Sequence, residues 1–237
     1  MTGLRGPVIV SGTDTGVGKT IVTAAIAAAA GRAGLRVAVL KPGQTGIPDG
    51  TEESDVDTVV RLAGPATATT LATYPDPLAP SAAARVSGLP QLDLFAVVGY
   101  ARELLAGHDV ILIEGAGGLL VPMGRTSAAR GRDAGFWTVA DLATILGAPM
   151  VVVTRAGLGT LNHTALTLEA LERRGITPHV VVGSWPAEPE LVHRTNLEDL
   201  AVQLDGVLPE GAGRLPPDAF RVQAASWLSP VLHGISG

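Results

Sequence analysis

The segment Gly12-Thr-Asp-Thr-Gly-Val-Gly-Lys-Thr20 decides how this 237-residue chain begins to fold. It follows a short apolar run, residues 7–11, and it leads into an Ala-rich stretch, residues 19–32, that is closed by Gly31 and Gly34. A strand, a glycine-rich turn and a helix in this order present free backbone N–H groups at a helix N-terminus, where anions bind. The segment therefore predicts a phosphate-binding turn between a strand and a helix.

The Gly-Lys-Thr ending is typical of a P-loop, in which the lysine reaches the β- and γ-phosphates and the hydroxyl ligates Mg²⁺. The match is imperfect, because the first glycine of the pattern should stand at position 13, whereas Gly12 comes one residue earlier. A turn that merely caps a helix is the alternative interpretation. The context favours nucleotide binding by Thr13, Asp14, Thr15, Gly16, Val17, Gly18, Lys19 and Thr20.

Further apolar runs alternate with helical patterns along the chain. We expect strands at 36–40, 109–113, 149–154 and 179–183, and helices at 54–62, 92–105, 138–146, 161–174, 191–204 and near 218–227. Continuous apolar strands separated by helices predict an α/β fold with one doubly wound, mostly parallel sheet and helices on both faces, as in P-loop NTPases. A single domain over residues 1–237 is the simplest organisation.

Two stretches of the sequence do not follow this alternation. Residues 65–90 are rich in Ala, Pro and Thr, and their prolines push each preceding residue out of the helical region, so no element is assigned there. Residues 124–135 are polar and glycine-rich, which predicts a surface loop.

Composition excludes several classes of function. The net charge is 17 − 22 = −5, which disfavours nucleic acid and anionic membranes as partners. The chain has no cysteine, so thiolate metal sites and thiol nucleophiles are excluded. No apolar run approaches the roughly 20 residues of a membrane helix, and no signal-peptide pattern opens the chain. We expect a cytoplasmic protein.

Two acidic residues stand where a P-loop protein needs carboxylates for its metal. Glu114 ends the apolar run 110–114, the usual place of a metal-binding acid beside the first strand. Asp55 stands at a predicted helix start after Ser54, where it could bind metal or simply complement the helix dipole. With the Thr20 hydroxyl, these residues form the predicted Mg²⁺ site.

Lysine is rare in this sequence. Of 17 basic residues only Lys19 and Lys41 are lysines, and the other 17 − 2 = 15 are arginines. A lysine kept in that background suggests a need for a compact ammonium on a flexible stem, although chance and a solvated strand-end lysine are the alternatives. Lys41 follows a predicted strand, at the edge of the sheet where ligands bind, so we expect it to be functional.

Taken together, Gly12–Thr20, Lys41-Pro42, Ser54-Asp55, Glu114–Gly118 and Gly157–His163 closely resemble the dethiobiotin synthetases, over about residues 8–185. That family makes the ureido ring of dethiobiotin from 7,8-diaminopelargonate, CO₂ (or bicarbonate) and ATP with Mg²⁺. The diamine forms a carbamate, the γ-phosphoryl group is transferred to it, and the second amine closes the ring and expels phosphate. The resemblance implies the same ligase reaction here.

The resemblance also implies roles for single residues. Lys19, Lys41 and Thr15 would be catalytic, with Lys19 on the phosphates and the other two on the carbamate. The nucleotide would also contact Glu114, Gly183 and Ser184. Thr45, Gly117 and Gly118 would line the diamine site. The helix start at Gly159, Thr160, Leu161 and Asn162, with Thr160 or Asn162 as its cap, would bind the substrate carboxylate of the partner subunit, which implies a homodimer.

This sequence departs from the family at two points. Gly16 replaces a glutamate that is frequent in the family's P-loop, and Gly183-Ser184-Trp185 lacks an asparagine that can read adenine. Because phosphate contacts do not depend on the base, we expect other nucleoside triphosphates to be accepted besides ATP.

Two other classes share part of these motifs. A partitioning-type switch ATPase would carry a second lysine early in the loop, where this chain has Asp14. A cobyrinate-type amidotransferase would need a glutaminase domain with a cysteine nucleophile, and this chain has no cysteine.

Overall fold

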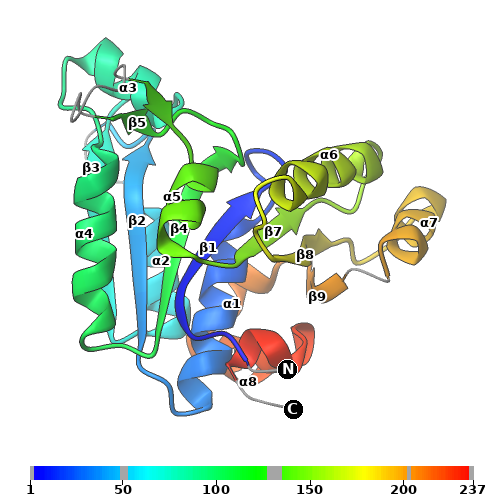
Figure 1. The fold of residues 1–237 in the computed structure, drawn as a ribbon. Coiled ribbons are helices and arrows are strands. Elements are labelled where there is room, and N and C mark those ends of the chain that lie inside the picture. Colours follow the sequence, from blue (N-terminus) through cyan, green and yellow to red (C-terminus); the bar gives the residue numbers. More distant parts are fainter. Residues whose placement is uncertain (1–2, 49–52, 127–134, 202–203, 235–237) are drawn as a thin grey trace.

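Seven parallel strands form the central sheet, in the order β3-β2-β4-β1-β7-β8-β9 (Figure 1). The computed structural model describes residues 3–48, 53–126, 135–201 and 204–234. The strands are β1 Gly6–Gly12, β2 Val37–Thr45, β3 Thr67–Tyr74, β4 Val110–Gly118, β7 Met150–Thr154, β8 Pro178–Trp185 and β9 Leu204–Pro209. The predicted doubly wound parallel sheet is confirmed.

Helices cover both faces of this sheet (Figure 1). They are α1 Lys19–Arg32, α2 Asp55–Ala63, α3 Pro80–Ser87, α4 Leu94–Leu105, α5 Val139–Leu146, α6 Thr160–Glu172, α7 Leu191–Leu200 and α8 Pro217–Gln223, followed by 3₁₀ turns at Ala224–Trp227 and Pro230–His233. One apolar core joins the sheet to α1, α2 and the C-terminal segment, and the other joins it to α3, α4, α5 and α6. Among the described residues, no helix is both long and apolar enough to span a bilayer.

The Ala-rich helix α1 is buried on nearly all sides. Its alanines 24, 25 and 27–30 are almost inaccessible, because the sheet lies on one side and α8 and the 3₁₀ turns lie on the other. Small side chains allow these neighbours to approach closely, and Phe220 of α8 fills the remaining space as a fully buried ring. The C-terminal segment therefore supports the helix that begins at the phosphate-binding turn.

Three predicted boundaries are wrong. The strand predicted to stop at Lys41 continues through Pro42 to Thr45, because β2 pairs with β4 only at Val37–Leu40 and the proline lies beyond that pairing. Likewise β4 runs on from Glu114 to Gly118. The helix predicted over 191–204 ends at Leu200, and Leu204 begins the edge strand β9.

The unassigned stretch 65–90 contains the edge strand β3 and helix α3. The side chains of β3 are mostly half-buried, because β3 has β2 as its sheet partner and forms the edge of the sheet. Within the predicted loop 124–135, Gly124–Arg125 (β5) pairs antiparallel with Phe136–Trp137 (β6). Residues 127–134 of that loop lie outside the described residues.

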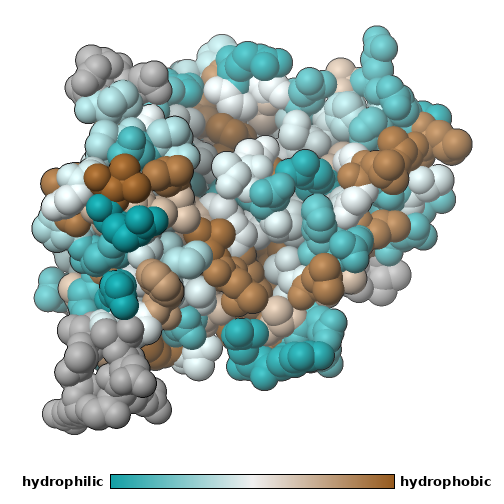
Figure 2. Space-filling view, turned by 90° about the horizontal axis from the view of Figure 1, so that it is seen from above, coloured by the Kyte–Doolittle hydropathy of each residue, from teal (hydrophilic) through white to brown (hydrophobic). Residues whose placement is uncertain are grey.

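The carboxyl ends of the strands meet at the upper edge of the sheet in Figure 1. The turn after β1, the end of β2 and the end of β4 lie next to one another there, because β1 pairs with β4 and β4 pairs with β2. Figure 2 looks down on this edge and shows its hydrophobic side chains in several separate patches between polar ones. The motifs singled out in the sequence are thus brought to one side of the molecule.

Candidate active site

The turn between β1 and α1 is held by close backbone packing. Gly18, with φ of 97°, is the N-cap of α1, in the left-handed region that favours glycine. Gly183 at the end of β8 packs directly against this turn, since a Cβ atom added there would lie 2.0 Å from the Val17 carbonyl oxygen. The predicted strand–turn–helix unit is confirmed, and β8 supports it from the side.

Lys19 folds back over this turn. Its Nζ donates a hydrogen bond of 3.0 Å to the Asp14 carbonyl oxygen, and its side chain is largely buried. Burial lowers the pKa of Lys19 by disfavouring the charged form, although the carboxylate of Glu114 works in the opposite direction. An anion bound in the turn would stabilise the charged form of Lys19, which burial disfavours.

Four side chains from four different elements converge beside Lys19. Lys41 of β2 lies with its Nζ 2.6 Å from Asp55 Oδ2 at the start of α2 and 2.9 Å from Glu114 Oε1 of β4. The Thr20 hydroxyl is 3.0 Å from both Asp55 Oδ1 and Glu114 Oε1. One selected lysine, both selected acids and the selected hydroxyl therefore form one cluster beside Lys19, which we call the charge cluster: Thr20, Lys41, Asp55 and Glu114.

Electrostatics favours the charged forms of Lys41 and Asp55 in this cluster. Burial disfavours the charged form of Lys41, but Glu114 and Asp55 outweigh it and raise the pKa of Lys41. Burial would likewise raise the pKa of Asp55, but the ammonium of Lys41 and the Thr20 hydroxyl lower it instead. Lys41 and Glu114 are only 4% and 2% exposed, whereas the Asp55 side chain is 33% exposed. Lys41 is therefore a buried cation at neutral pH, paired with two acids.

The acids of the charge cluster are oriented by neighbours. Ser54 caps α2 in a reciprocal capping box with Asp57, which confirms the helix start predicted after Ser54. The Asp55 N–H donates to Gln44 Oε1 at 3.2 Å, and the Thr23 hydroxyl lies 2.9 Å from Glu114 Oε2. Gln44 and Thr23 were not selected from the sequence. Thr23 could have been found, because it is a hydroxyl residue one helical turn after Lys19 in an otherwise apolar stretch.

A cavity of about 420 Å³ lies over the charge cluster. Ten of its lining residues were selected from the sequence, namely Thr15, Gly16, Gly18, Lys19, Thr20, Lys41, Thr45, Asp55, Glu114 and Gly117. Ile21, Gly43, Gln44 and Ala116 complete the lining. A concave site with convergent lysines, acids and hydroxyls can bind a phosphate chain and a second anionic group next to it.

Other selected residues lie outside this lining. Thr13 uses its N–H to bond the Val153 carbonyl oxygen, and Gly118 packs against the Gly12 and Thr13 carbonyl oxygens, so both belong to the framework of the turn. Asp14 pairs with Arg155 at 2.8 Å, on the surface. The other selected residues that do not line the cavity are Val17, Gly183, Ser184, Gly159, Thr160, Leu161 and Asn162.

The start of α6 differs from the expectation. Its N-cap is Gly159 rather than Thr160 or Asn162, and no side chain from the described part of the chain caps it. The Thr160 hydroxyl instead lies 2.7 Å from the Thr154 hydroxyl in the protein interior. Leu158, just before this helix, is 87% exposed.

The charge cluster suits Mg²⁺ chemically. The described residues contain no group of three or more histidines, aspartates and glutamates placed to hold a metal. Mg²⁺, however, needs only one or two carboxylates, with water and phosphate oxygens completing its shell. Asp55, Glu114 and the Thr20 hydroxyl supply that partial set, around a point where the structure holds the Lys41 ammonium.

Comparison with known proteins decides the family. The AAA domain family matches residues 7–212. The ATP-dependent dethiobiotin synthetase BioD of Rhodococcus jostii is 51% identical over 224 residues, covering 92% of this chain and 93% of that protein. The enzyme of the same name from Saccharopolyspora erythraea is 52% identical over 231 residues, covering 95% of this chain and 96% of that protein. This chain belongs to the dethiobiotin synthetase family.

Solved structures of other proteins share only the fold with this dethiobiotin synthetase family member. The cell division ATPase MinD of Pyrococcus furiosus has a TM-score of 0.53 at 20% identity, covering 92% of this chain and 97% of that one. MinD of Aquifex aeolicus has a TM-score of 0.53 at 16% identity and covers 98% of each chain. The sequence-based resemblance and the fold class are both confirmed.

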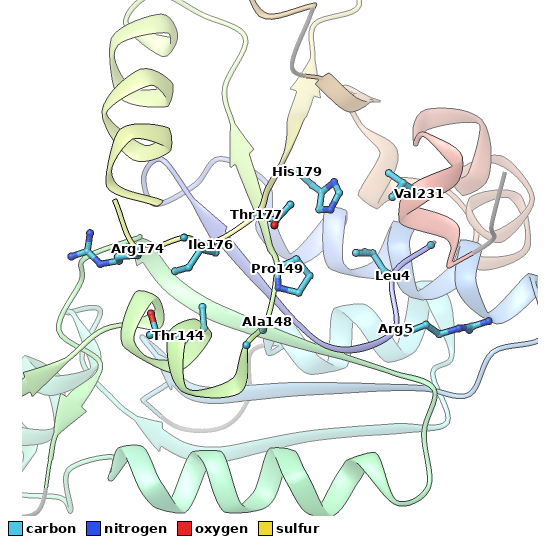
Figure 3. A pocket seen from close by; sticks show the side chains of 14 residues that line it. Leu4, Arg5, Thr144, Ala148, Pro149, Arg174, Ile176, Thr177, His179 and Val231 are labelled. Atoms are coloured by element: carbon cyan, nitrogen blue, oxygen red, sulfur yellow. The ribbon is translucent and has the colours of Figure 1, made fainter. Parts of the chain in front are cut away.

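A second cavity of about 650 Å³ lies at the opposite, amino-terminal edge of the sheet (Figure 3). Its walls come from Leu4, Ala148, Pro149, Ile176 and Val231, while the labelled arginines point away from its centre (Figure 3). It contains none of the residues selected from the sequence. In this dethiobiotin synthetase family member, the candidate active site is therefore the cavity beside the P-loop, although its volume is smaller than that of the cavity in Figure 3.

Proposed function

We propose that this chain is an ATP-dependent dethiobiotin synthetase that joins 7,8-diaminopelargonate and CO₂ into a ureido ring. The observation that carries this proposal is the buried Lys41 ammonium, held by Asp55 and Glu114 within reach of the cavity next to the P-loop. Family membership at about 50% identity over nearly the whole chain supports it.

The reaction divides into three balanced steps. One amine of the diamine attacks CO₂ and loses a proton, which gives a carbamate. A carbamate oxygen attacks the γ-phosphorus of ATP, and ADP leaves. The second amine attacks the carbonyl carbon of the resulting mixed anhydride, the ring closes, and phosphate leaves with a proton released. Both later steps need positioning and charge stabilisation rather than a covalent nucleophile, in keeping with a chain that has no cysteine.

In this proposal the two lysines divide the negative charge between them. Lys19 and the N–H groups of the turn bind the β- and γ-phosphates, while the Lys41 ammonium neutralises the carbamate and the oxygens of the transferring phosphoryl group. The pKa of Lys41 is raised, so it binds as a cation. Thr15, whose hydroxyl lies near Gly117, contacts the carbamate, and Thr45 lies toward the diamine.

Thr20, Asp55 and Glu114 would hold Mg²⁺. Bound there, the ion would screen the phosphate charges that repel the carbamate. Lys41 then turns from the acids to the substrate, which requires only a rotation of its flexible stem because the acids line the same cavity. ATP is the proposed phosphoryl donor. Other nucleoside triphosphates are proposed to replace it, since the residues that contact the phosphates do not read the base.

We further propose a cytoplasmic homodimer, built from one domain per chain, in which the start of α6 binds the carboxylate of the substrate held by the partner. The N-cap Gly159 leaves backbone N–H groups at this helix start without a side-chain cap among the described residues. Exposed Leu158 and the partly exposed Leu161 flank these groups, as expected of an interface rim that desolvates a ligand.

Mixing two inactive variants tests this shared site. Lys41→Gln damages the site on its own chain, whereas Asn162→Asp places a negative charge where the partner's substrate carboxylate would bind. In mixed dimers one of the two sites is then intact, so mixing should restore about a quarter of wild-type turnover in a twofold dimer. No recovery on mixing would contradict the shared site. Sedimentation of the wild-type protein as a monomer would do the same.

The enzymatic proposal is tested by the product. Purified protein is incubated with MgATP, ¹³C-bicarbonate and 7,8-diaminopelargonate, and the product is identified by mass. The proposal predicts one ¹³C atom in dethiobiotin and none in a control without nucleotide. Absence of labelled dethiobiotin in the complete reaction would overturn it.

A further inference from the structure

Thr23 lies directly behind the charge cluster. It stands one turn after Lys19 in α1, its side chain is fully buried, and its neighbours along the helix are alanines, isoleucines and a valine. Its Oγ1 lies 2.9 Å from Glu114 Oε2 and 3.0 Å from the Lys19 carbonyl oxygen. A hydroxyl enclosed by apolar residues and aimed at a buried carboxylate suggests a specific task.

The Thr23 hydroxyl has one proton for two acceptors. A bond to the carbonyl oxygen four residues earlier is common for threonine in helices and requires no function. The carboxylate of Glu114, however, forms an ion pair of 2.9 Å with Lys41, and hydrogen bonds to ionised acceptors are roughly twice as strong as neutral ones. The Thr23 hydroxyl therefore donates its hydrogen bond mainly to the Glu114 carboxylate.

The two oxygens of Glu114 have different partners. Oε1 accepts from Lys41 and from Thr20, and Oε2 accepts from Thr23. During the proposed reaction Lys41 turns toward the substrate and the Thr20 oxygen turns toward the metal. Among the described residues, Thr23 is then the contact that Glu114 keeps.

We propose that Thr23 is a positioning residue, which fixes the rotation of the Glu114 carboxylate so that Oε1 faces the metal and the nucleotide. This inference rests on the proposed function, because it assumes that Glu114 binds the metal. Thr23 itself touches neither substrate nor metal. Outer partners that orient a metal-binding side chain typically change metal affinity or activity by about 10–100-fold when removed.

The test measures divalent-metal affinity rather than turnover alone. Mn²⁺ is titrated into protein saturated with ADP, and free Mn²⁺ is followed by electron paramagnetic resonance, since Mn²⁺ accepts the same oxygen ligands. Thr23→Val keeps the shape and removes the donor, and we expect it to weaken Mn²⁺ binding by about 10-fold or more. Thr23→Ser keeps the hydroxyl and should restore the wild-type affinity.

Two further variants control this experiment. Thr164→Val removes another buried helical hydroxyl, which bonds Thr154 on the far side of the sheet, and it should leave Mn²⁺ affinity unchanged. If Thr23→Val does not fold, Thr23→Ala replaces it, because the helix is already rich in alanine. ADP affinity measured without metal should be equal in all variants.

The outcomes separate this inference from the proposed function. If Glu114→Gln weakens Mn²⁺ binding but the hydroxyl-free Thr23 variant binds like the wild type, the positioning role is wrong and the proposed metal site stands. If Glu114→Gln also binds like the wild type, the metal site itself is wrong. Equal losses in the serine and the hydroxyl-free variants would likewise overturn the positioning role, because the loss would then come from packing.

Discussion

Replacement of Lys41 by glutamine tests whether its ammonium stabilises the ligand-free protein by compensating the charges of Asp55 and Glu114. Lys41 and Glu114 are almost inaccessible and lie 2.9 Å apart. Removal of one partner of a buried ion pair typically costs about 3–5 kcal/mol, because the other charge stays buried without compensation. Asp55 is a third exposed, so water screens its share of the loss. We therefore expect about 3 kcal/mol, the lower end of that range.

Thermal denaturation measures this loss. For a chain of this size 1 kcal/mol corresponds to about 2–4 °C, so Lys41→Gln should lower the Tm by about 6–12 °C without ligands. Mg²⁺ should offset much of this, because a cation can now stand between the acids without displacing an ammonium. At a concentration of 100 times its Kd, the ion would return about 2.7 kcal/mol. In the wild type the same addition should raise the Tm less.

A control variant shows how large the loss from an exposed ion pair is, and two results would contradict the prediction. Arg61→Gln breaks an ion pair with Glu53 in which both side chains are about 40% exposed, and it should cost at most about 1 kcal/mol. A loss for Lys41→Gln no larger than this control would show that Lys41 does not hold the acids. Equal stabilisation of the variant and the wild type by Mg²⁺ would refute competition between the ammonium and the cation.

Three further changes address the nucleotide. Glu114→Gln should raise the Mg²⁺ concentration needed for tight nucleotide binding, which titration calorimetry at several Mg²⁺ concentrations measures; an unchanged dependence would remove Glu114 from the metal site. Gly183→Ala places a methyl group 2.0 Å from the Val17 carbonyl oxygen, so it should displace the P-loop and weaken nucleotide binding by about 10-fold. Gly107→Ala is the control, because its methyl group meets no atom within 4 Å and nucleotide affinity should not change. CTP should support turnover within about a hundredfold of ATP in kcat/KM, and a larger preference, above about 2.7 kcal/mol, would contradict tolerance of the base.

Lys41→Gln also separates binding from chemistry. ADP affinity should stay near that of the wild type, because in the proposed mechanism Lys19 and the turn bind the phosphates independently of Lys41. Diamine-dependent turnover should fall by about 100-fold or more, the usual effect of removing a group that stabilises developing negative charge. Near-normal turnover would show that Lys41 has no role in phosphoryl transfer.

The sequence was sufficient for the central part of the fold. Apolar runs that end in Gly12 and in Glu114 predicted two strands, and the two do pair as neighbours β1 and β4. The edge strands could not be predicted in the same way. The sequence of β3 follows a mixed pattern because its side chains are only half-buried. The helix predicted over 191–204 overlaps only the first residue of β9, and the rest of β9 carries no strand pattern before it pairs with β8.

The candidate site was predictable by residue type but not by contact. Asp55 and Glu114 were predicted to meet beside Thr20, and Lys41 was selected separately from the end of a strand. That the Lys41 ammonium lies between the two acids depends on how β2, β4 and α2 pack together, which the sequence does not state. Gln44 was missed because only its bond to the Asp55 N–H distinguishes it from any other strand-end glutamine. Thr23 did leave a signal, a hydroxyl one helical turn after Lys19 in an apolar stretch, but the sequence does not show that it reaches Glu114.

The most direct test of the central claim is phosphate release by the purified protein with MgATP and bicarbonate, measured with and without 7,8-diaminopelargonate. The proposed mechanism predicts release that depends on the diamine and that equals the amount of dethiobiotin formed, because each ring closure expels one phosphate. Slow release that is indifferent to the diamine would contradict it. The nucleotide site would then stand, the substrate assignment would fall, and a switch ATPase would become the better explanation.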